Sequence, residues 1–267
     1  MKKLILGLDG MDFDIAVDLD LKNVLQIQFG RIIVPISEIL GRPSSPEVWA
    51  SFLCGEHVKK VFAGKKRLGL LKYLVKLKNL FPFISLGLGK KVSGQIVGFP
   101  ELDRETWVDL PNVKEVNSPY YSYTNEVFEY AEQFGVDKDL DNFRKNLSDL
   151  YERDIKKITS AVKSEIEHPE CDILFAYLHF PDMFSHTWFQ DKDKLFSLHR
   201  EIDDFVGTIL KMLKKDIHVI IISDHGFDFK VNDHSDLGFI SSNKFMNFPK
   251  DIIGLGKLMY EYAGANK

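Results

Sequence analysis

Residues 217–226 read IHVIIISDHG, and this stretch decides the fold that we expect. The apolar run at 219–222 is typical of a strand buried on both faces, as in the parallel sheets of α/β proteins. The run ends in Asp224 and His225, and a glycine follows them. Open α/β sheets bind ligands and metals at the carboxyl ends of their strands, so this pair is a candidate site. An ordinary polar turn is the alternative.

Two other apolar stretches end in the same way. Residues 3–8 predict a buried strand that ends at Asp9, where the following glycine allows a tight exit. Residues 172–179 predict another buried strand, and Asp182 and His186 follow it at i, i+4. On one helical turn, that spacing places both side chains within reach of a single metal ion.

A predicted helix start carries two adjacent serines, Ser44 and Ser45. Pro46 suits the first helical turn, and Glu47 suits the positive end of the helix dipole. A serine at this place is either a simple N-cap or a nucleophile. In the second case, the helix N-terminus would stabilise both its alkoxide and an incoming phosphate.

The candidate site residues have the chemistry of a metal centre. They are Asp9, Ser44 or Ser45, Asp182, His186, Asp224, His225 and His234. Carboxylates, imidazoles and a hydroxyl suit Zn²⁺ or Mn²⁺ better than an all-oxygen Ca²⁺ site. The Asp and His residues suffice for two ions, and paired ions are the usual apparatus of phosphoryl displacement. His234, in a polar loop, is a candidate third ligand for the ion of Asp182 and His186.

Hydrophobic periodicity places the remaining elements around these strands. It predicts helices over 12–22, 124–134, 139–167 and 192–215, a helix after Pro46 and another within 249–267, and strands over 31–36 and 238–240. The length of 267 residues allows one large α/β domain, or a main domain with a smaller insert. We expect a single domain over 1–267.

Residues 59–123 are expected to form a cap or insert within that domain. Residues 59–91 contain Lys and Arg but no acidic residue, and leucines recur at helical spacing over 67–81. This basic amphipathic helix either contacts an anionic membrane surface, gathers an anionic substrate, or is a solvated face packed by its leucines. Residues 92–123, rich in Gly, Pro, Tyr and Asn, indicate an irregular segment.

We expect a globular protein located in the cytoplasm. Hydrophobic residues make up 45% of the chain and charged residues 28%, and the net charge of −4 gives no nucleic-acid signature. The apolar run near the start ends at Leu8, too short for a signal peptide or a membrane span. Cys54 and Cys171 are expected as free thiols in a reducing compartment, although sequence alone leaves a bridge between them open.

The order of these motifs resembles that of the alkaline phosphatase superfamily, most closely the type I phosphodiesterase/nucleotide pyrophosphatase family. The motifs are GLDG at 7–10, SSPEVWASFLCG at 44–55, PDMFSH at 181–186, SDHG at 223–226 and then His234. The resemblance spans nearly the whole chain, although residues 59–171 match only in length and general character. It implies a doubly wound, mostly parallel central sheet flanked by helices, with a small inserted cap.

The resemblance also implies roles for the candidate residues. One ion would be held by Asp182, His186 and His234, and the other by Asp9, Asp224 and His225, with the nucleophile bridging towards the second. Counting back from the proline implies Ser44 as nucleophile, whereas alignment on Trp49 implies Ser45; Ser44 is the preferred candidate. Serine replaces the usual threonine of the phosphodiesterases, and Cys54 replaces a threonine before glycine.

The function implied is hydrolysis of phosphate esters, of phosphodiester or nucleotide pyrophosphate type, through a phosphoseryl intermediate. The cofactors would be two divalent ions, Zn²⁺ or alternatively Mn²⁺, and the partner a small anionic phosphate ester. The serine leaves open a phosphomonoesterase, a phosphoglycerate mutase-like enzyme or, less readily, a sulfatase. A metal-binding module without turnover, acting at an anionic surface through 67–81, is the alternative of another class.

Overall fold

The computed structural model describes residues 1–59, 102–123, 126 and 139–265. The helix predicted over 67–81, and all but one residue of that predicted over 124–134, lie outside the described residues. The strands are β1 (Lys3–Leu8), β2 (Gln28–Ile33), β3 (Val113–Val116), β4 (Ile173–Leu178), β5 (His218–Ser223), β6 (Phe227–Asp228), β7 (Asp233–His234) and β8 (Leu237–Ser242). The helices are α1 (Phe13–Asp18), α2 (Ser45–Cys54), the 3₁₀ helix η2 (Trp107–Asp109), α6 (Leu140–Glu167), α7 (Phe180–Trp188), α8 (Lys192–Met212) and α9 (Ile252–Tyr262).

A six-stranded sheet in the order β2-β8-β5-β1-β4-β3 forms the centre of the described chain. β1 lies between β4 and β5 and pairs in parallel with both, and β3 extends the parallel part from β4. β8 is antiparallel to β5, and β2 is antiparallel to β8. The prediction of a mostly parallel sheet in an α/β fold is therefore confirmed.

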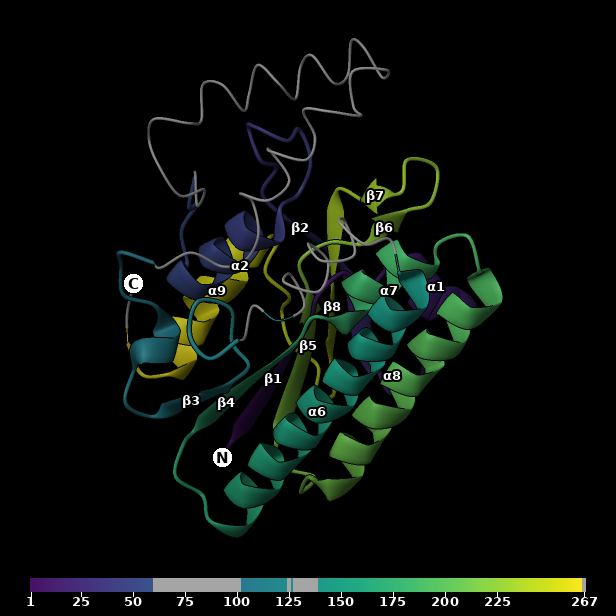
Figure 1. Ribbon diagram of the computed structural model, residues 1–267. Helices are drawn as coiled ribbons and strands as arrows, with labels where there is room; N and C mark the ends of the chain where they lie inside the picture. The colour runs from purple at the N-terminus through teal and green to yellow at the C-terminus, as the bar shows by residue number, and fades with distance from the viewer. Residues whose placement is uncertain (60–101, 124–125, 127–138, 266–267) are drawn as a thin grey trace.

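Helices cover both faces of this sheet (Figure 1): α6, α7 and α8 lie on one face, and α2 and α9 on the other. Each face has its own hydrophobic core. Alternate residues of β1 point to opposite cores, because Leu4 and Leu6 belong to the α6 and α8 side and Ile5 to the α2 and α9 side. Burial on both faces explains why β1, β4 and β5 read as continuous apolar runs.

The second strand and the first helix differ from their predicted bounds. β2 covers Gln28–Ile33, not 31–36, and pairs antiparallel with β8 at the sheet edge. Pro35 has no N–H for the ladder, so pairing cannot continue through it. α1 ends at Asp18, not at 22, and Asp20 beyond it has a positive φ of 51° that a helix does not allow.

Part of the predicted cap belongs instead to the central sheet. β3 (Val113–Val116) lies within the stretch predicted to be irregular, yet its residues pair in parallel with β4. Its short sequence, VKEV, is half polar and gives only a weak strand pattern. Residues 60–101 of the expected cap lie outside the described residues.

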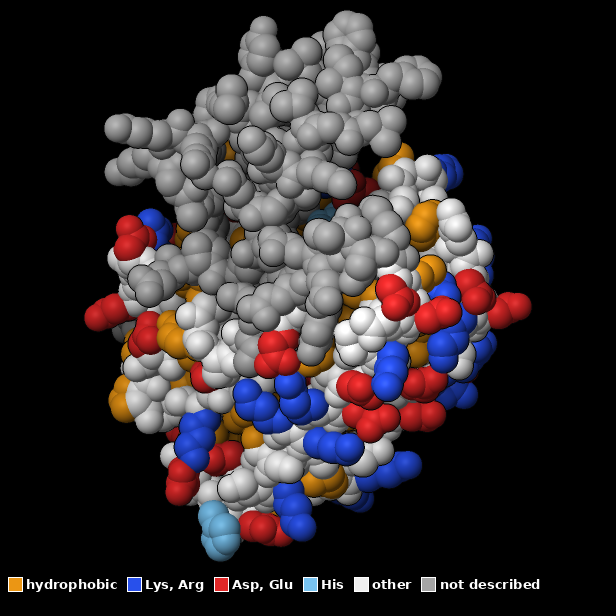
Figure 2. Space-filling model, in the orientation of Figure 1, with side chains coloured by type: hydrophobic (Ala, Val, Ile, Leu, Met, Phe, Trp, Pro, Cys, Tyr) orange, Lys and Arg blue, Asp and Glu red, His pale blue; other side chains and the backbone are white. Residues whose placement is uncertain are grey.

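The described surface and its thiols are those of an ordinary globular chain. Cys54 and Cys171 are free and buried, as predicted. Acidic and basic side chains are interspersed over α6 and α8 on the face that Figure 2 shows. Among the described helices, none is both long and apolar enough to cross a membrane.

Two strand glycines provide a test of this packing. A Cβ on Gly7 in β1 would lie 2.8 Å from Cη2 of Trp49 and 3.3 Å from Cε2 of Phe175. We expect Gly7→Ala to lower the free energy of unfolding by about 1–3 kcal/mol through overpacking, measured by urea denaturation. The control is Gly30→Ala in β2, where a Cβ meets nothing within 4 Å. Equal stability of the two variants would contradict close packing of Trp49 on β1.

Candidate active site

The site lies where β1, β4 and β5 end. Asp9 follows β1, and Asp224 and His225 follow β5. Leu8 of β1 is in register with Leu178 of β4, so His179 after β4 stands beside Asp9. These side chains meet because parallel neighbours end at one edge of the sheet.

Asp9 is fully buried and hydrogen-bonded on both oxygens. The Trp49 indole N–H donates to its Oδ2 at 3.0 Å, and the Tyr177 hydroxyl donates to the same oxygen. The Ser45 hydroxyl donates to Oδ1 at 3.3 Å. Burial alone would raise the pKa of Asp9, but His179 and His225 hold it below its usual value. Asp9 is therefore an oriented carboxylate that favours its charged form.

Gly10 allows the carboxylates to converge. Its φ is 65°, and a Cβ on it would lie 2.6 Å from Cβ of Asp182. Its backbone N–H donates to Oδ1 of Asp224 at 3.1 Å. Directly before it, the Asp9 carbonyl accepts from the Asp182 N–H at 2.9 Å. Only glycine fits this left-handed position against α7.

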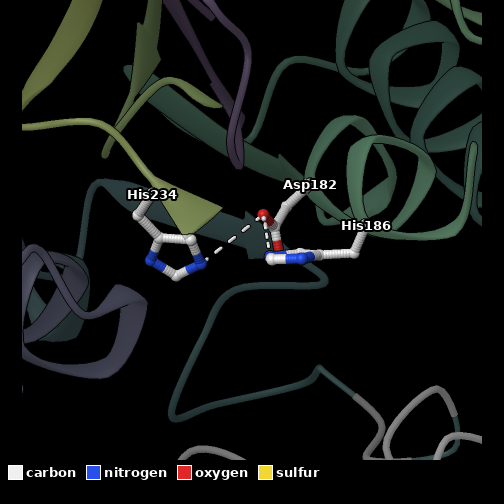
Figure 3. Close-up of side chains that lie close together, drawn as sticks. All are labelled: Asp182, His186 and His234. Atoms are coloured by element: carbon white, nitrogen blue, oxygen red, sulfur yellow. Dashed lines mark ion pairs between the residues drawn. The ribbon is translucent and has the colours of Figure 1, made fainter. Parts of the chain in front are cut away.

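Asp182, His186 and His234 form the first candidate metal group (Figure 3). His186 lies one turn after Asp182 on α7, and its Nε2 is 3.3 Å from Oδ1 of Asp182. His234 reaches the same oxygen from β7, with Nε2 at 3.7 Å. Nδ1 of His234 donates to the Pro43 carbonyl at 3.1 Å, which leaves Nε2 facing Asp182. The structure thus brings together the three residues predicted for one ion.

The second candidate group contains Asp9, Asp182 and His225, whose ligand atoms lie within 4.8 Å of one another. Asp224 is also beside it, with Oδ2 at 3.4 Å from Nε2 of His225. Nδ1 of His225 faces the Gly226 carbonyl at 3.0 Å, so Nε2 points into the cluster. The predicted set of Asp9, Asp224 and His225 is thus assembled, and Asp182 lies between the two groups.

The described cluster fits divalent metal ions. Oδ1 of Asp182 and Oδ2 of Asp224 are buried, and neither has a hydrogen-bond partner among the described residues. A buried carboxylate oxygen without a partner is costly, and a bound cation removes that cost. The mixed carboxylate and imidazole donors suit a transition metal or zinc.

The protonation states of His225 and His234 differ. Burial alone would lower the pKa of His225, but Asp224 and Asp9 raise it to about 10. Burial and the charge of His225 lower the pKa of His234 to about 3. The two rings stack with centroids 3.6 Å apart, which explains this coupling. Without metal, a protonated His225 partly balances the carboxylates, and His234 is neutral and ready to bind.

The two candidate serines are placed differently. Ser45 begins α2, and its Oγ lies 3.1 Å from Nε2 of His225 and 3.3 Å from Oδ1 of Asp9. Ser44 is the N-cap residue and makes no side-chain capping bond. Both are buried. The geometry therefore brings Ser45, the second choice from sequence, into the carboxylate cluster.

Two site residues were missed in the sequence. Tyr177 donates to Asp9, and its hydroxyl lies 3.0 Å from Nδ1 of His179. His179 is buried, 3.9 Å from Oδ2 of Asp9 and 4.0 Å from Oδ2 of Asp182. The available signal was the position of His179 directly after a buried strand, which matches that of Asp9 after β1. Tyr177 gave no such signal, because an aromatic residue inside an apolar run is typical of core.

Comparisons with known proteins agree with this fold. The model of the type I phosphodiesterase / nucleotide pyrophosphatase family matches residues 90–242, more than half of the chain. Alkaline phosphatase from the Antarctic bacterium TAB5 is similar in structure, with a TM-score of 0.56 and 12% identity over 100% of this chain and 98% of that chain. A variant of that enzyme, with Mg bound in its M3 site, has a TM-score of 0.55 and 14% identity over 100% of this chain and 99% of that chain.

Murine ectonucleotide pyrophosphatase / phosphodiesterase 5 gives a TM-score of 0.46 and 15% identity over 85% of this chain and 57% of that chain. No curated protein matches the sequence. The alkaline phosphatase-like fold that the motifs implied is confirmed by the TAB5 structures.

Zinc binding is expected to release protons and to tighten as pH rises towards about 10. His225 is protonated at neutral pH because its pKa is about 10, and a metal-binding nitrogen must lose its proton. Calorimetric titration in buffers of different ionisation enthalpy measures the number released. His225→Gln should release roughly one proton fewer, and the control His168→Gln, at an exposed position, should match the parent. Equal release in all three would contradict this charge balance.

Proposed function

Because the chain belongs to the type I phosphodiesterase / nucleotide pyrophosphatase family, we propose that it hydrolyses phosphoesters with two divalent ions and a serine nucleophile. The observation that carries this proposal is the Ser45 hydroxyl at the start of α2, in contact with both Asp9 and His225. The site combines an oriented hydroxyl, a helix N-terminus and acidic metal ligands, which are the parts that phosphoryl transfer requires.

The residues that would hold the ions fall into two sets. Asp182, His186 and His234 would hold one ion, and Asp9, Asp224 and His225 the other, with Asp182 close to both. When bound, the ions supply positive charge for the phosphate oxygens and lower the pKa of coordinated hydroxyls or water. Zinc is our preferred metal, with manganese as the alternative.

Ser45 is our proposed nucleophile, in place of Ser44. Asp9 and His225 hold its Oγ in position, and the first N–H groups of α2 favour negative charge beside it. In the first step, Oγ would bond to phosphorus as the ester oxygen leaves and takes a proton. In the second step, water would displace the serine oxygen and regenerate the hydroxyl, releasing phosphate or a phosphate monoester. Burial of Asp9, Asp182 and Asp224 limits the water around these groups.

A phosphomonoesterase is the second candidate function. It is favoured by the serine at the nucleophile position and by Arg42, whose guanidinium pairs with Asp233 beside His234. Activity on nucleotide pyrophosphates, the zinc identity and the cytoplasmic location remain predictions. A module that binds metal without turnover is expected to show metal binding but no hydrolysis of any ester.

The adjacent serines allow a matched test of the nucleophile. With Zn²⁺ or Mn²⁺ present, Ser45→Ala should lower kcat about 1,000-fold or more, because it removes the hydroxyl proposed to form the covalent bond. Ser44→Ala should lower kcat less than about tenfold, since it removes an N-cap side chain with no capping bond. The substrates are p-nitrophenyl phosphate and bis(p-nitrophenyl) phosphate. A large loss in Ser44→Ala alone would restore Ser44 as the nucleophile.

A further inference from the structure

Arg42 lies in the loop that leads into α2, three positions before Ser45. Its guanidinium pairs with Asp233, the residue before the candidate ligand His234. Its backbone carbonyl accepts from the Ser37 N–H at 2.9 Å, which fixes the loop locally. Arg42 therefore links the loop that leads to the proposed nucleophile with the strand that carries His234.

Two further contacts fasten this loop to the site. The Pro43 carbonyl, directly after Arg42, accepts from Nδ1 of His234 at 3.1 Å. Asp233, which pairs with Arg42, also accepts from the His234 N–H on its Oδ1 at 2.8 Å. The guanidinium is thus held at the side of the cluster where Asp182, His186 and His234 meet.

Arg42 has donors that the described residues leave unused. The ion pair with Asp233 engages one terminal nitrogen, and Nε is buried with no hydrogen-bond partner among the described residues. A guanidinium offers five N–H donors in a planar fork that matches phosphate. Its charge also acts on the site: although Asp182 raises the pKa of His186, Arg42 opposes that increase.

Other described arginines have different surroundings. Arg31 pairs with Asp14, and Arg104 pairs with Glu56, and none of these residues belongs to the carboxylate cluster. The side chains of Arg42 and Arg104 are equally exposed, at 41%. Arg104 therefore serves as a matched control for removal of a guanidinium.

We propose that Arg42 contacts the non-bridging oxygens of the substrate phosphate and selects doubly charged, terminal phosphates over singly charged diesters. This inference rests on the proposed function, because it assigns the substrate class of the same site. A terminal phosphate has three non-bridging oxygens and two charges, whereas a diester has two oxygens and one charge. The planar guanidinium of Arg42 therefore binds a terminal phosphate more strongly than a diester.

The test compares Arg42→Ala, Arg42→Lys and Arg104→Ala with the parent at saturating Zn²⁺. Arg42→Ala should lower kcat/KM for p-nitrophenyl phosphate about 10- to 100-fold, because it removes a charge-assisted contact. The decrease in kcat/KM for bis(p-nitrophenyl) phosphate should be several-fold smaller. Arg42→Lys should recover only part of the loss, because it keeps the charge without the fork. Arg104→Ala should match the parent on both substrates.

Asp233→Asn separates substrate contact from support of the loop. If Arg42 only anchors His234 through Asp233, then Asp233→Asn and Arg42→Ala should lower activity on both substrates equally and reduce bound zinc, measured by elemental analysis. That result would overturn the proposal. If the proposal holds, Asp233→Asn should keep the monoester preference of the parent, and Arg42→Ala should keep its zinc.

Binding of inorganic phosphate distinguishes failure of this inference from failure of the proposed function. If the parent hydrolyses neither ester, the proposed function fails, and calorimetry of phosphate binding to the zinc-loaded proteins decides about Arg42. Affinity that is about tenfold or more weaker in Arg42→Ala than in Arg104→Ala supports the contact. Equal affinity in these two variants overturns it, whatever the activity.

Discussion

Mutual repulsion among three buried carboxylates is the constraint on which this structure depends. Asp9, Asp182 and Asp224 are at most 6% exposed and lie together at one edge of the sheet. Burial and the proximity of Asp9 raise the pKa of Asp224 well above its usual value, whereas His186 keeps that of Asp182 low despite burial. Such a cluster is stable only with positive charge among its members. The histidines supply part of that charge, and the two ions that we propose would complete it.

The surrounding hydrogen bonds keep the carboxylates in place while leaving oxygens for an ion. The Trp49 indole and the Tyr177 hydroxyl occupy Oδ2 of Asp9, so Oδ1 faces Ser45. The Gly10 N–H occupies Oδ1 of Asp224, and Oδ2 of Asp224 has no hydrogen-bond partner among the described residues. Neutral donors thus fix Oδ2 of Asp9 and Oδ1 of Asp224. This division is expected of residues that orient metal ligands.

The sequence predicted the parts of the site that depend on strand ends. Asp9, Asp224 and His225 were recognisable because each ends a buried apolar run, and Asp182 and His186 because their spacing is one helical turn. The choice between Ser44 and Ser45 depends on where α2 begins, since that decides which side chain faces the sheet edge. One-residue shifts of this kind are beyond sequence patterns.

Other features could not be predicted, because they arise from tertiary contacts between segments that are far apart in the sequence. β3 is half polar and becomes a strand only because β4 offers it an open edge. Tyr177 sits inside a run that is apolar on both faces, and only the register of β1 with β4 places its hydroxyl beside Asp9. Arg42 lies in a loop without periodicity, and its approach to Asp233 depends on the β6 and β7 ribbon.

The central position of β1 has a consequence for synthesis of the chain. Lys3 pairs with both Ile173 and His218, so β1 leaves the ribosome long before either of its partner strands. Until those strands emerge, its apolar side chains and the backbone N–H and C=O groups on both of its edges are unpaired and exposed. A chain in this state tends to aggregate and is a typical substrate of chaperones. These long-range pairings also predict slow folding, and Asp9 joins its partners only when the last parallel strand has docked.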